Sequence, residues 1–259
     1  MRRPRLATRG DAVNLRSLGR LTDALLRRCE TCRGPSSTGP LCAACLADLP
    51  LNRWACIRCA EPFPTPPSGP VFCAHCLTQM PAFDRVLAPL LYAPPVSTAI
   101  QALKFRQDIS AGRRLAGWLH RTLPDIVSPD LAIPVPLHAA RTRERGFNQA
   151  LEIARPLCRR RGWTLVPDGV RRVRSTAAQT RLDAAARRRN LRNAFAVDQT
   201  VEGARVFVID DVVTTGATTS SLAHALHQAG AADVVVIAAA RTPHADSDQN
   251  ANTSTTASN

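Results

Sequence analysis

The sequence is poor in aromatic residues, has no long apolar run and lacks an export signal. Aromatic side chains make up 4% of the 259 residues, which argues against the stacking platforms that usually hold single-stranded nucleic acid. No stretch approaches the roughly 18 consecutive apolar residues of a membrane-spanning helix, so we expect no membrane insertion. The amino-terminal stretch MRRPRLATRGD is basic but contains no apolar core of the signal-peptide kind. We therefore expect a cytoplasmic protein.

Two common phosphate-binding motifs are also absent. The only lysine, Lys104, follows a leucine, so the Gly-Lys-Ser/Thr sequence of a P-loop does not occur. No G-x-G-x-x-G motif is present either, which argues against a dinucleotide-binding fold. The other 33 of the 34 basic residues are arginine. In so biased a chain, the single lysine is either a compact phosphate contact or a product of chance.

The positive charge is concentrated in one part of the chain. The formal net charge is +14 and the isoelectric point is near 10.9, which favours binding to polyanions. Between His138 and Arg192, fifteen arginines stand against four acidic residues, an excess of eleven charges. The arginine bias would also follow from a GC-rich genome. On charge alone, single-stranded DNA is a candidate partner.

Eight of the nine cysteines form four C-x-x-C pairs. The pairs are Cys29/Cys32, Cys42/Cys45, Cys56/Cys59 and Cys73/Cys76. Two such pairs complete a tetrahedral Zn²⁺ site, and the short, proline-rich segments between them cannot bury a core without metal. We expect two structural zinc ions, with the pairs combined in sequence order. An interleaved combination, and replacement of one cysteine by His75, are the alternatives.

The stretch from Val206 to Thr218, VFVIDDVVTTGAT, predicts a strand, a loop and the start of a helix. Its leading apolar residues are typical of a strand buried on both faces of a parallel sheet. Asp210 and Asp211 then suit two vicinal hydroxyls, or a hydroxyl and a hydrated Mg²⁺. The hydroxyl and glycine residues that follow leave backbone N–H groups free for a phosphate at a helix start. The alternative is an ordinary buried strand with a polar turn.

Further strands and helices are predicted on either side of this stretch. The run Leu131 to Pro136 predicts a second buried strand, which ends in a junction that contains His138, Arg141 and Arg145. The arginine-dense segment Val170 to Asn193 predicts a mobile loop that closes over an anionic substrate, or a solvated basic helix. The remaining predicted elements are helices at Leu15–Leu26, Ser97–Phe105 and around Leu115–Leu119, and strands at Arg85–Tyr92, Trp163–Val166 and Val234–Ala239.

Together these motifs resemble the ComF family, competence-associated proteins built from a cysteine-rich zinc domain and a phosphoribosyltransferase domain. The resemblance covers about residues 20–242. The motifs that carry it are the four C-x-x-C pairs, Leu103-Lys104-Phe105, Pro134–His138, Arg145–Gln149, Arg174–Gln179, Arg187 with Asn190, and the DDVVTTGAT loop. One position departs from the family pattern, because Gln107 stands where a glycine is expected, in the turn from Arg106 to Asp108.

The resemblance implies an α/β fold, namely a type I phosphoribosyltransferase-like parallel sheet flanked by helices, with a small N-terminal zinc-ribbon domain. We expect a disordered basic N-terminus at residues 1–20 and a cysteine-rich double zinc ribbon at 21–80. The phosphoribosyltransferase-like domain would follow at 85–242, and a disordered polar tail at 243–259.

By the same resemblance, the loop binds 5-phosphoribosyl-1-pyrophosphate (PRPP) together with Mg²⁺. Asp210 and Asp211 would bind the ribose 2′- and 3′-hydroxyls, and Thr214 to Thr218 the 5′-phosphate. The PRPP-binding residues implied are Asp210, Asp211, Val213, Thr214, Thr215, Gly216, Ala217 and Thr218. The residues implied on the pyrophosphate side are Lys104, His138, Arg141 and Arg145, and the catalytic residues implied are Arg174, Arg187 and Asp211. The alternative for His138 is an ordinary loop or core histidine.

Two classes of function follow from these expectations. The first is an enzyme that transfers ribose 5-phosphate from PRPP to an unidentified acceptor and releases pyrophosphate. The second is a non-catalytic protein on the same fold, which binds single-stranded DNA or senses PRPP. The resemblance implies a role in DNA uptake or DNA utilisation in either case, with competence proteins as further partners.

Overall fold

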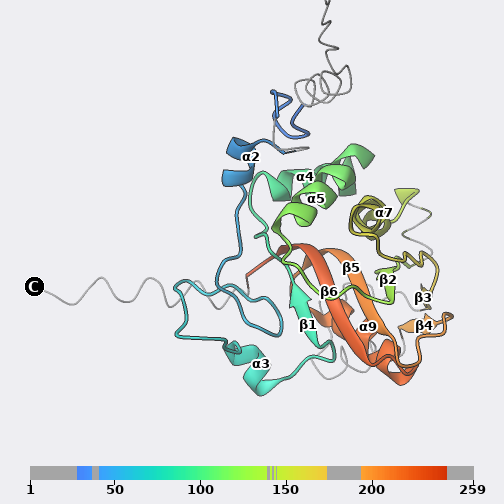
Figure 1. Ribbon diagram of the computed structural model, residues 1–259. Coiled ribbons are helices and arrows are strands. Elements are labelled where there is room, and N and C mark those ends of the chain that lie inside the picture. The colour runs from blue at the N-terminus through green and yellow to red at the C-terminus, as the bar shows by residue number, and fades with distance from the viewer. Residues whose placement is uncertain are drawn as a thin grey trace, which may run out of the picture. The chain divides into compact units, whose positions relative to one another are not determined.

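The computed structural model describes residues 28–36, 41–138, 141, 143, 145–173 and 194–243 (Figure 1). The chain divides into two compact units, Met1–Asp48 and Leu49–Asn259. The predicted helix at Leu15–Leu26 and the implied catalytic residues Arg174 and Arg187 lie outside the described residues. Among the described residues, no helix is both long and apolar enough to cross a membrane.

The larger unit is built on a parallel sheet of four strands. These are β1 (Arg85–Leu87), β2 (Leu131–Pro134), β5 (Arg205–Val213) and β6 (Asp233–Arg241), in the spatial order β1-β6-β5-β2. The two central strands pair in parallel from Arg205 opposite Asp233 to Val213 opposite Arg241. From Val206 to Ile209 and from Val234 to Ala240 the side chains are buried, as the apolar runs of these strands require when helices cover both faces.

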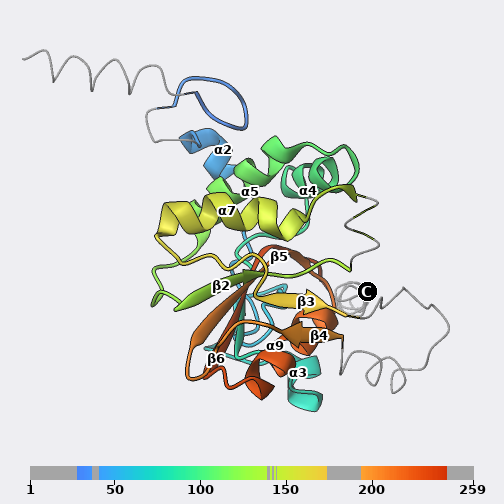
Figure 2. The same ribbon diagram turned by 90° about the vertical axis from the view of Figure 1, so that its right-hand side faces the viewer.

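Helices cover both faces of this sheet, as Figures 1 and 2 show. Three of them lie on one face: α4 (Val96–Phe105), α5 (Ile109–Thr122) and α7 (Gln149–Arg161). On the other face lies α9 (Ala217–Gln228). The side chain of Asn148 caps α7 by accepting from the Ala150 N–H at 3.0 Å, and α7 ends at Gly162, whose φ of 71° is left-handed. The predicted parallel sheet flanked by helices is thus confirmed.

Some local predictions need correction. The strand predicted at Trp163–Val166 is reduced to one bridge between Leu165 and Ala132, since Pro167 follows and cannot donate to a ladder. The start of the basic segment, where no strand was predicted, forms β3 (Val170–Arg172), which pairs antiparallel with β4 (Phe195–Val197). The strands that flank positions 174–193 in the sequence are therefore paired with each other.

Gln107 takes the conformation that a glycine would take at its position. Its φ is 54°, in the left-handed region, which costs a residue with a side chain roughly 1–2 kcal/mol. The turn between α4 and α5 is closed by the Asp108 N–H, which donates to the Ala102 carbonyl at 3.2 Å. The turn thus keeps its left-handed conformation although Gln107 replaces the glycine of the family pattern.

The outer edge of β1 is covered by the chain that precedes it. The Val86 N–H donates to the Arg58 carbonyl at 2.8 Å, and the Asn52 N–H donates to the Pro89 carbonyl at 2.8 Å. The Asn52 side chain also donates to the Ala88 carbonyl at 3.2 Å. Residues near the third C-x-x-C pair therefore form part of the border of the sheet.

Candidate anion-binding site and metal centres

A cavity of about 300 Å³ lies at the carboxyl ends of β2 and β5, the edge at which open α/β sheets bind ligands. Its wall is formed by the loop between β5 and α9, the segments that follow β2, and the end of α4. The lining residues are Lys104, Phe105, Val135, Pro136, Leu137, Arg141, Arg145, Asn148, Gln149, Ala150, Arg172 and Asp210 to Thr219. Its lining is more polar than apolar and carries charges of both signs, which suits a charged ligand.

The two adjacent carboxylates stand at the end of β5. Asp211 is 8% exposed, and its carboxylate forms an ion pair with the ammonium group of Lys104 at the end of α4. The Asp211 N–H donates to the Asp210 Oδ1 at 2.8 Å. Lys104 thus contacts a carboxylate implied to bind ribose, although it was expected on the pyrophosphate side.

Burial and the neighbouring Asp211 carboxylate raise the pKa of Asp210 well above its usual range. Lys104 opposes that shift. On the opposite wall, burial and the nearby Arg141 lower the pKa of Arg172, while Asp210 opposes that change. Two carboxylates, three guanidinium groups and the Lys104 ammonium group therefore share one cavity, where burial of either charge is costly unless an opposite charge compensates it.

Replacing Asp210 by Asn is expected to stabilise the free protein. Because the folded state raises the pKa of this carboxyl, the folded state loses stability as the pH rises from about 4, the pKa of the unfolded chain, through the raised value. Asn carries no charge and can still accept the Asp211 N–H. Urea unfolding at pH 8 should show a gain of about 0.5–2 kcal/mol, and the gain should shrink toward pH 5. A loss of stability that is independent of pH would contradict this cause.

The loop between β5 and α9 is fixed by its glycine and by an aromatic ring behind it. Gly216 has a φ of 73°, and a Cβ there would lie 3.4 Å from the ring of Phe83, so only glycine fits without strain. The Thr219 hydroxyl donates to the Gly216 carbonyl at 3.0 Å. Thr214 and Thr215 are exposed. The helix start and these hydroxyl groups therefore face the cavity as an anion site requires.

The basic junction after β2 forms the other wall. Arg141, Arg145 and Asn148 line the cavity, and the Asn148 side chain donates to the Val135 carbonyl at 3.0 Å. His138 is half-buried and makes a backbone bridge with Arg172. It is not among the lining residues. The structure thus brings Lys104, Arg141 and Arg145 to the cavity, and the implied roles of all four residues stay predictions.

Sequence reasoning missed Arg241 in this region, and it left Arg172 open between a contact to DNA and a contact to the pyrophosphate. Arg172 lines the cavity because it ends β3, and Arg241 lies behind the loop at the end of β6, 1% exposed. Neither stands in a recognisable motif. Arg172 lay within the basic segment but without a strand to place it, and a buried arginine carries no sequence signal of its own.

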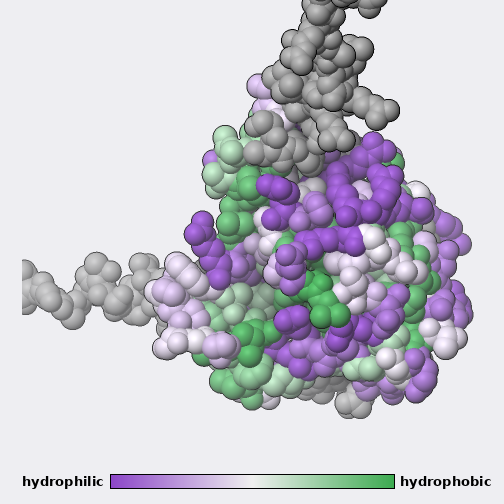
Figure 3. Space-filling view, in the orientation of Figure 1, coloured by the Kyte–Doolittle hydropathy of each residue, from purple (hydrophilic) through white to green (hydrophobic). Residues whose placement is uncertain are grey.

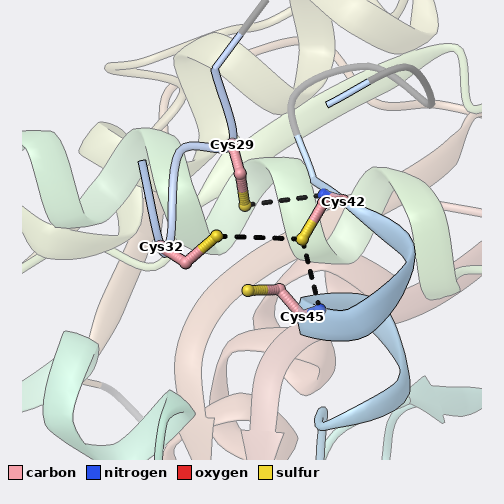
Figure 4. Close-up of side chains that lie close together, drawn as sticks. All are labelled: Cys29, Cys32, Cys42 and Cys45. Atoms are coloured by element: carbon pink, nitrogen blue, oxygen red, sulfur yellow. Dashed lines mark hydrogen bonds between the residues drawn. The ribbon is translucent and has the colours of Figure 1, made fainter. Parts of the chain in front are cut away.

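The eight paired cysteines form two clusters of four thiols. The first cluster is Cys29, Cys32, Cys42 and Cys45, and the second is Cys56, Cys59, Cys73 and Cys76. Within each cluster the sulfur atoms all lie within 4.8 Å of one another, and Figure 4 shows the four thiols of the first cluster converging. The pairs are therefore combined in sequence order. His75 belongs to neither cluster.

In each cluster, hydrogen bonds stabilise one cysteine as the thiolate. In the first cluster the backbone N–H groups of Thr31 and Cys42 donate to the Cys29 sulfur at 3.4 and 3.5 Å. Burial raises the pKa of Cys29, but these donors and that of Cys32 outweigh it and lower the pKa to about 6. In the second cluster, hydrogen bonding from Cys59 lowers the pKa of Cys56 to about 4. Four convergent sulfur donors are the ligand set of a structural zinc site.

The second cluster lies inside the larger unit. Its four cysteines are each at most 7% exposed and belong to the same apolar core as Phe83, Val86 and Val213. The first cluster belongs to the smaller unit. The sequence placed both clusters in one domain at 21–80, but burial against the sheet unites the second cluster with the strands. The expected domain bounds remain a proposal.

The parallel sheet, its helices and the DDVVTTGAT loop at its carboxyl edge agree with the type I phosphoribosyltransferase-like fold that the sequence predicted. Comparison with known proteins places the chain more narrowly. It is 36% identical to the DNA utilization protein YhgH of Escherichia coli O157:H7 over 222 residues, which cover 83% of this chain and 96% of the relative. It is 34% identical to Competence protein F of Haemophilus influenzae over 181 residues, 65% of this chain and 78% of the relative. The chain belongs to the ComF family.

Matches to solved structures are partial. A glutamine PRPP amidotransferase from B. subtilis, complexed with ADP and GMP, is 22% identical over 51% of this chain and 26% of that one, with a TM-score of 0.33. A hypoxanthine phosphoribosyltransferase from Trypanosoma cruzi is 14% identical over 52% and 75%, with a TM-score of 0.30. Superpositions at this level assign neither fold nor activity. No family model matches the sequence.

Proposed function

We propose that the cavity binds PRPP with Mg²⁺ and that the protein acts in the utilisation or uptake of DNA. The observation that carries the first part is the geometry at the end of β5, where two carboxylates and a helix-start loop open into one cavity. The second part rests on the names of the relatives, DNA utilization protein and Competence protein F. Zinc in the two thiol clusters would have a structural role.

Each wall of the cavity would hold a different part of the ligand. Asp210 and Asp211 would accept hydrogen bonds from the ribose 2′- and 3′-hydroxyls, and the loop from Val213 to Thr218 would surround the 5′-phosphate. Arg141 and Arg145 would bind the pyrophosphate, and Lys104 would leave Asp211 to join them. Mg²⁺ bound with PRPP would neutralise pyrophosphate charge.

In the catalytic version of the proposal, the bond between the anomeric carbon and the pyrophosphate oxygen breaks as an acceptor attacks that carbon. The bonding electrons leave with pyrophosphate, whose charge the arginines would stabilise. The carboxylates would stabilise the positive charge that develops on the ribose. Arg174 and Arg187, in the segment that joins β3 to β4, would close over the substrate. The residues that line the cavity do not identify the chemical class of the acceptor.

Replacing Asp211 by Asn should weaken PRPP binding. The change removes a charged acceptor for a ribose hydroxyl, and such a hydrogen bond contributes roughly 1.5–3 kcal/mol, about 10- to 150-fold in affinity. Calorimetric titration with PRPP and Mg²⁺ measures the loss, and pyrophosphate release across candidate acceptors then tests catalysis.

The control for this measurement is Asp198→Asn. Asp198 is also paired with an arginine, since Arg171 Nε donates to its Oδ2 at 2.6 Å, but it is not among the residues that line the cavity. Its replacement should leave PRPP affinity unchanged. If wild-type protein binds no PRPP at millimolar concentration, the loop is structural here and the proposed ligand is wrong.

A second function, binding of nucleic acid, is favoured by the surface of α5 and α7. These helices pack side by side and expose Arg113, Arg121, Arg155 and Arg159. Hydrophilic residues gather on the surface over α5 in Figure 3. Exposed arginines on adjacent helices provide phosphate contacts without a requirement for base stacking. This surface could serve single-stranded DNA whether or not the cavity is catalytic.

A further inference from the structure

The two thiol clusters share the same first turn but differ in the residue whose carbonyl closes it. In each, the first cysteine N–H donates at 2.8 Å to the carbonyl five residues later, that of Gly34 in the first cluster and of Glu61 in the second. The residue before that carbonyl is left-handed in both, with φ of 63° at Arg33 and 56° at Ala60. A glycine is therefore sufficient at the closing position of this turn. The turn does not require the side chain of Glu61.

The added carboxylate is paired with a buried arginine. Arg241 Nη2 lies 2.5 Å from Glu61 Oε2, and the two side chains are 1% and 7% exposed. Arg241 Nε also donates to the Cys59 carbonyl at 3.1 Å. One guanidinium group thus holds the turn of the second cluster at two points. A buried pair of this kind is costly to form, so its retention calls for a role beyond stability.

The same guanidinium group holds the phosphate loop. Its Nη1 donates to the carbonyls of Val213, at 3.1 Å, and Thr214. In a trans peptide the C=O and N–H point in opposite directions. The N–H groups of Thr214 and Thr215 are therefore directed away from Arg241, which lies on the buried side of a loop whose residues line the cavity. An anion site needs its N–H groups turned toward the ligand in this way.

A second contact joins the other half of the cluster to the same loop. The segment after Cys76 places the Phe83 ring against Gly216 and lets the Ala82 N–H donate to the Ser220 hydroxyl at 3.0 Å. The first C-x-x-C pair of the second cluster thus contacts the loop between β5 and α9 through Arg241. The segment after the other pair contacts the loop and the start of α9 through Phe83 and Ala82.

From these contacts we infer that Arg241 is a positioning residue through which the second cluster sets the conformation of the phosphate loop, so that phosphoribosyl binding depends on that cluster. This inference rests on the proposed function. The cysteine ligands fix the positions of the Cys59 carbonyl and of Glu61. Both groups hold the Arg241 side chain, which in turn holds the carbonyls of Val213 and Thr214. When the cluster loses its metal, the loop loses its orientation, and affinity for the phosphate group falls with it.

The test compares Glu61→Gln with Asp233→Asn in the full-length protein. Gln retains an acceptor for Arg241 but not the charge, whereas Asp233 belongs to an ion pair with Arg205, 2.7 Å long, at the opposite end of the same two strands. Glu61→Gln should lower PRPP affinity about tenfold, the effect of one charge-assisted hydrogen bond. It should also speed amide hydrogen exchange in residues 213–219 without ligand. Asp233→Asn should change neither.

Hydrogen exchange also separates positioning from simple destabilisation. In wild-type protein, withdrawing metal with a chelator should speed exchange in residues 56–61 and 213–219 together. In Glu61→Gln the loop should already exchange fast, so that the chelator adds little there. Effects of the chelator and of Glu61→Gln that do not add up indicate that both act through the same series of contacts.

The outcomes are distinguishable. If Glu61→Gln fails to fold, Glu61→Asp keeps the charge but shortens the side chain, and the same two measurements apply with smaller expected effects. If wild-type protein binds no PRPP, the proposed function fails and loop exchange alone decides the inference. Folded Glu61 variants with two metal ions, unchanged loop exchange and, where PRPP binds, unchanged affinity would overturn the inference.

Discussion

Removal of one ligand of the second cluster, by Cys56→Ser, is expected to lower the melting temperature of the larger unit, whereas Cys29→Ser should leave that temperature unchanged. Cys56 is 2% exposed in the core that contains Phe83 and Val86, so the second cluster and the sheet share one core. Loss of a structural metal belongs to the changes that cost more than about 4 kcal/mol, against a typical total stability of about 5–15 kcal/mol. Thermal unfolding followed by circular dichroism, with metal analysis of each variant, measures the difference.

Cys158→Ala is the matched control for this prediction. Cys158 is 2% exposed and belongs to neither cluster, and burial raises the pKa of its thiol to about 12, as expected of a cysteine that only packs. The variant should keep two metal ions and a cooperative transition. If Cys56→Ser leaves the melting temperature of the larger unit unchanged as well, the second cluster does not stabilise its core. If wild-type protein contains no zinc, the metal assignment itself is wrong.

Single-stranded DNA is expected to bind with an affinity that falls steeply as salt rises. Each phosphate contacted adds about −0.7 to the slope of log affinity against log salt on a single strand. Simultaneous replacement of Arg113, Arg155 and Arg159 by Gln should therefore reduce the slope by about two. The few aromatic residues predict little preference for base sequence. Fluorescence anisotropy of a labelled oligonucleotide across a salt series measures both effects.

A control with the same change of charge tests whether the surface of α5 and α7 is the site. Arg53, Arg85 and Arg171 are also exposed, and their joint replacement lowers the net charge equally. That variant should keep nearly the full slope. Equal losses in the two triple variants would mean that only total charge matters. Saturating PRPP adds a further comparison, because competition with DNA would place both ligands in the cavity and independence would place them on separate surfaces.

The central strand, the loop after it and the pairing of cysteines could be predicted from sequence because each depends on local spacing. Apolar residues from Val206 to Ile209 predict a buried strand without knowledge of the partner strands, although β5 continues past Asp210 and Asp211 to Val213. The C-x-x-C spacing brings two thiols together whatever surrounds them. These features are encoded within a few residues.

The parts that sequence reasoning missed depend on contacts between distant segments. Nothing near Arg241 in the sequence indicates that Glu61, far earlier in the chain, lies against it. The place of the second cluster in the core of the sheet likewise depends on Phe83 and Val86 packing with Val213. Trp163–Val166 has the composition of a strand, but only Leu165 finds a bridge partner. Strand propensity shows that a segment can pair in a sheet. Whether it does so depends on a neighbouring strand, which the local sequence does not reveal.

Both borders of the sheet are closed by irregular chain rather than left open. The four-residue β2 is flanked by the bridge at Leu165, and the three-residue β1 by the Arg58 carbonyl, which lies between two thiols of the second cluster. An open border invites another chain to add a strand, which is how sheets aggregate. We therefore expect metal binding at the second cluster to limit aggregation as well. Protein made without enough metal should be lost as insoluble aggregate, because withdrawing Arg58 exposes a border next to the long apolar strand β6.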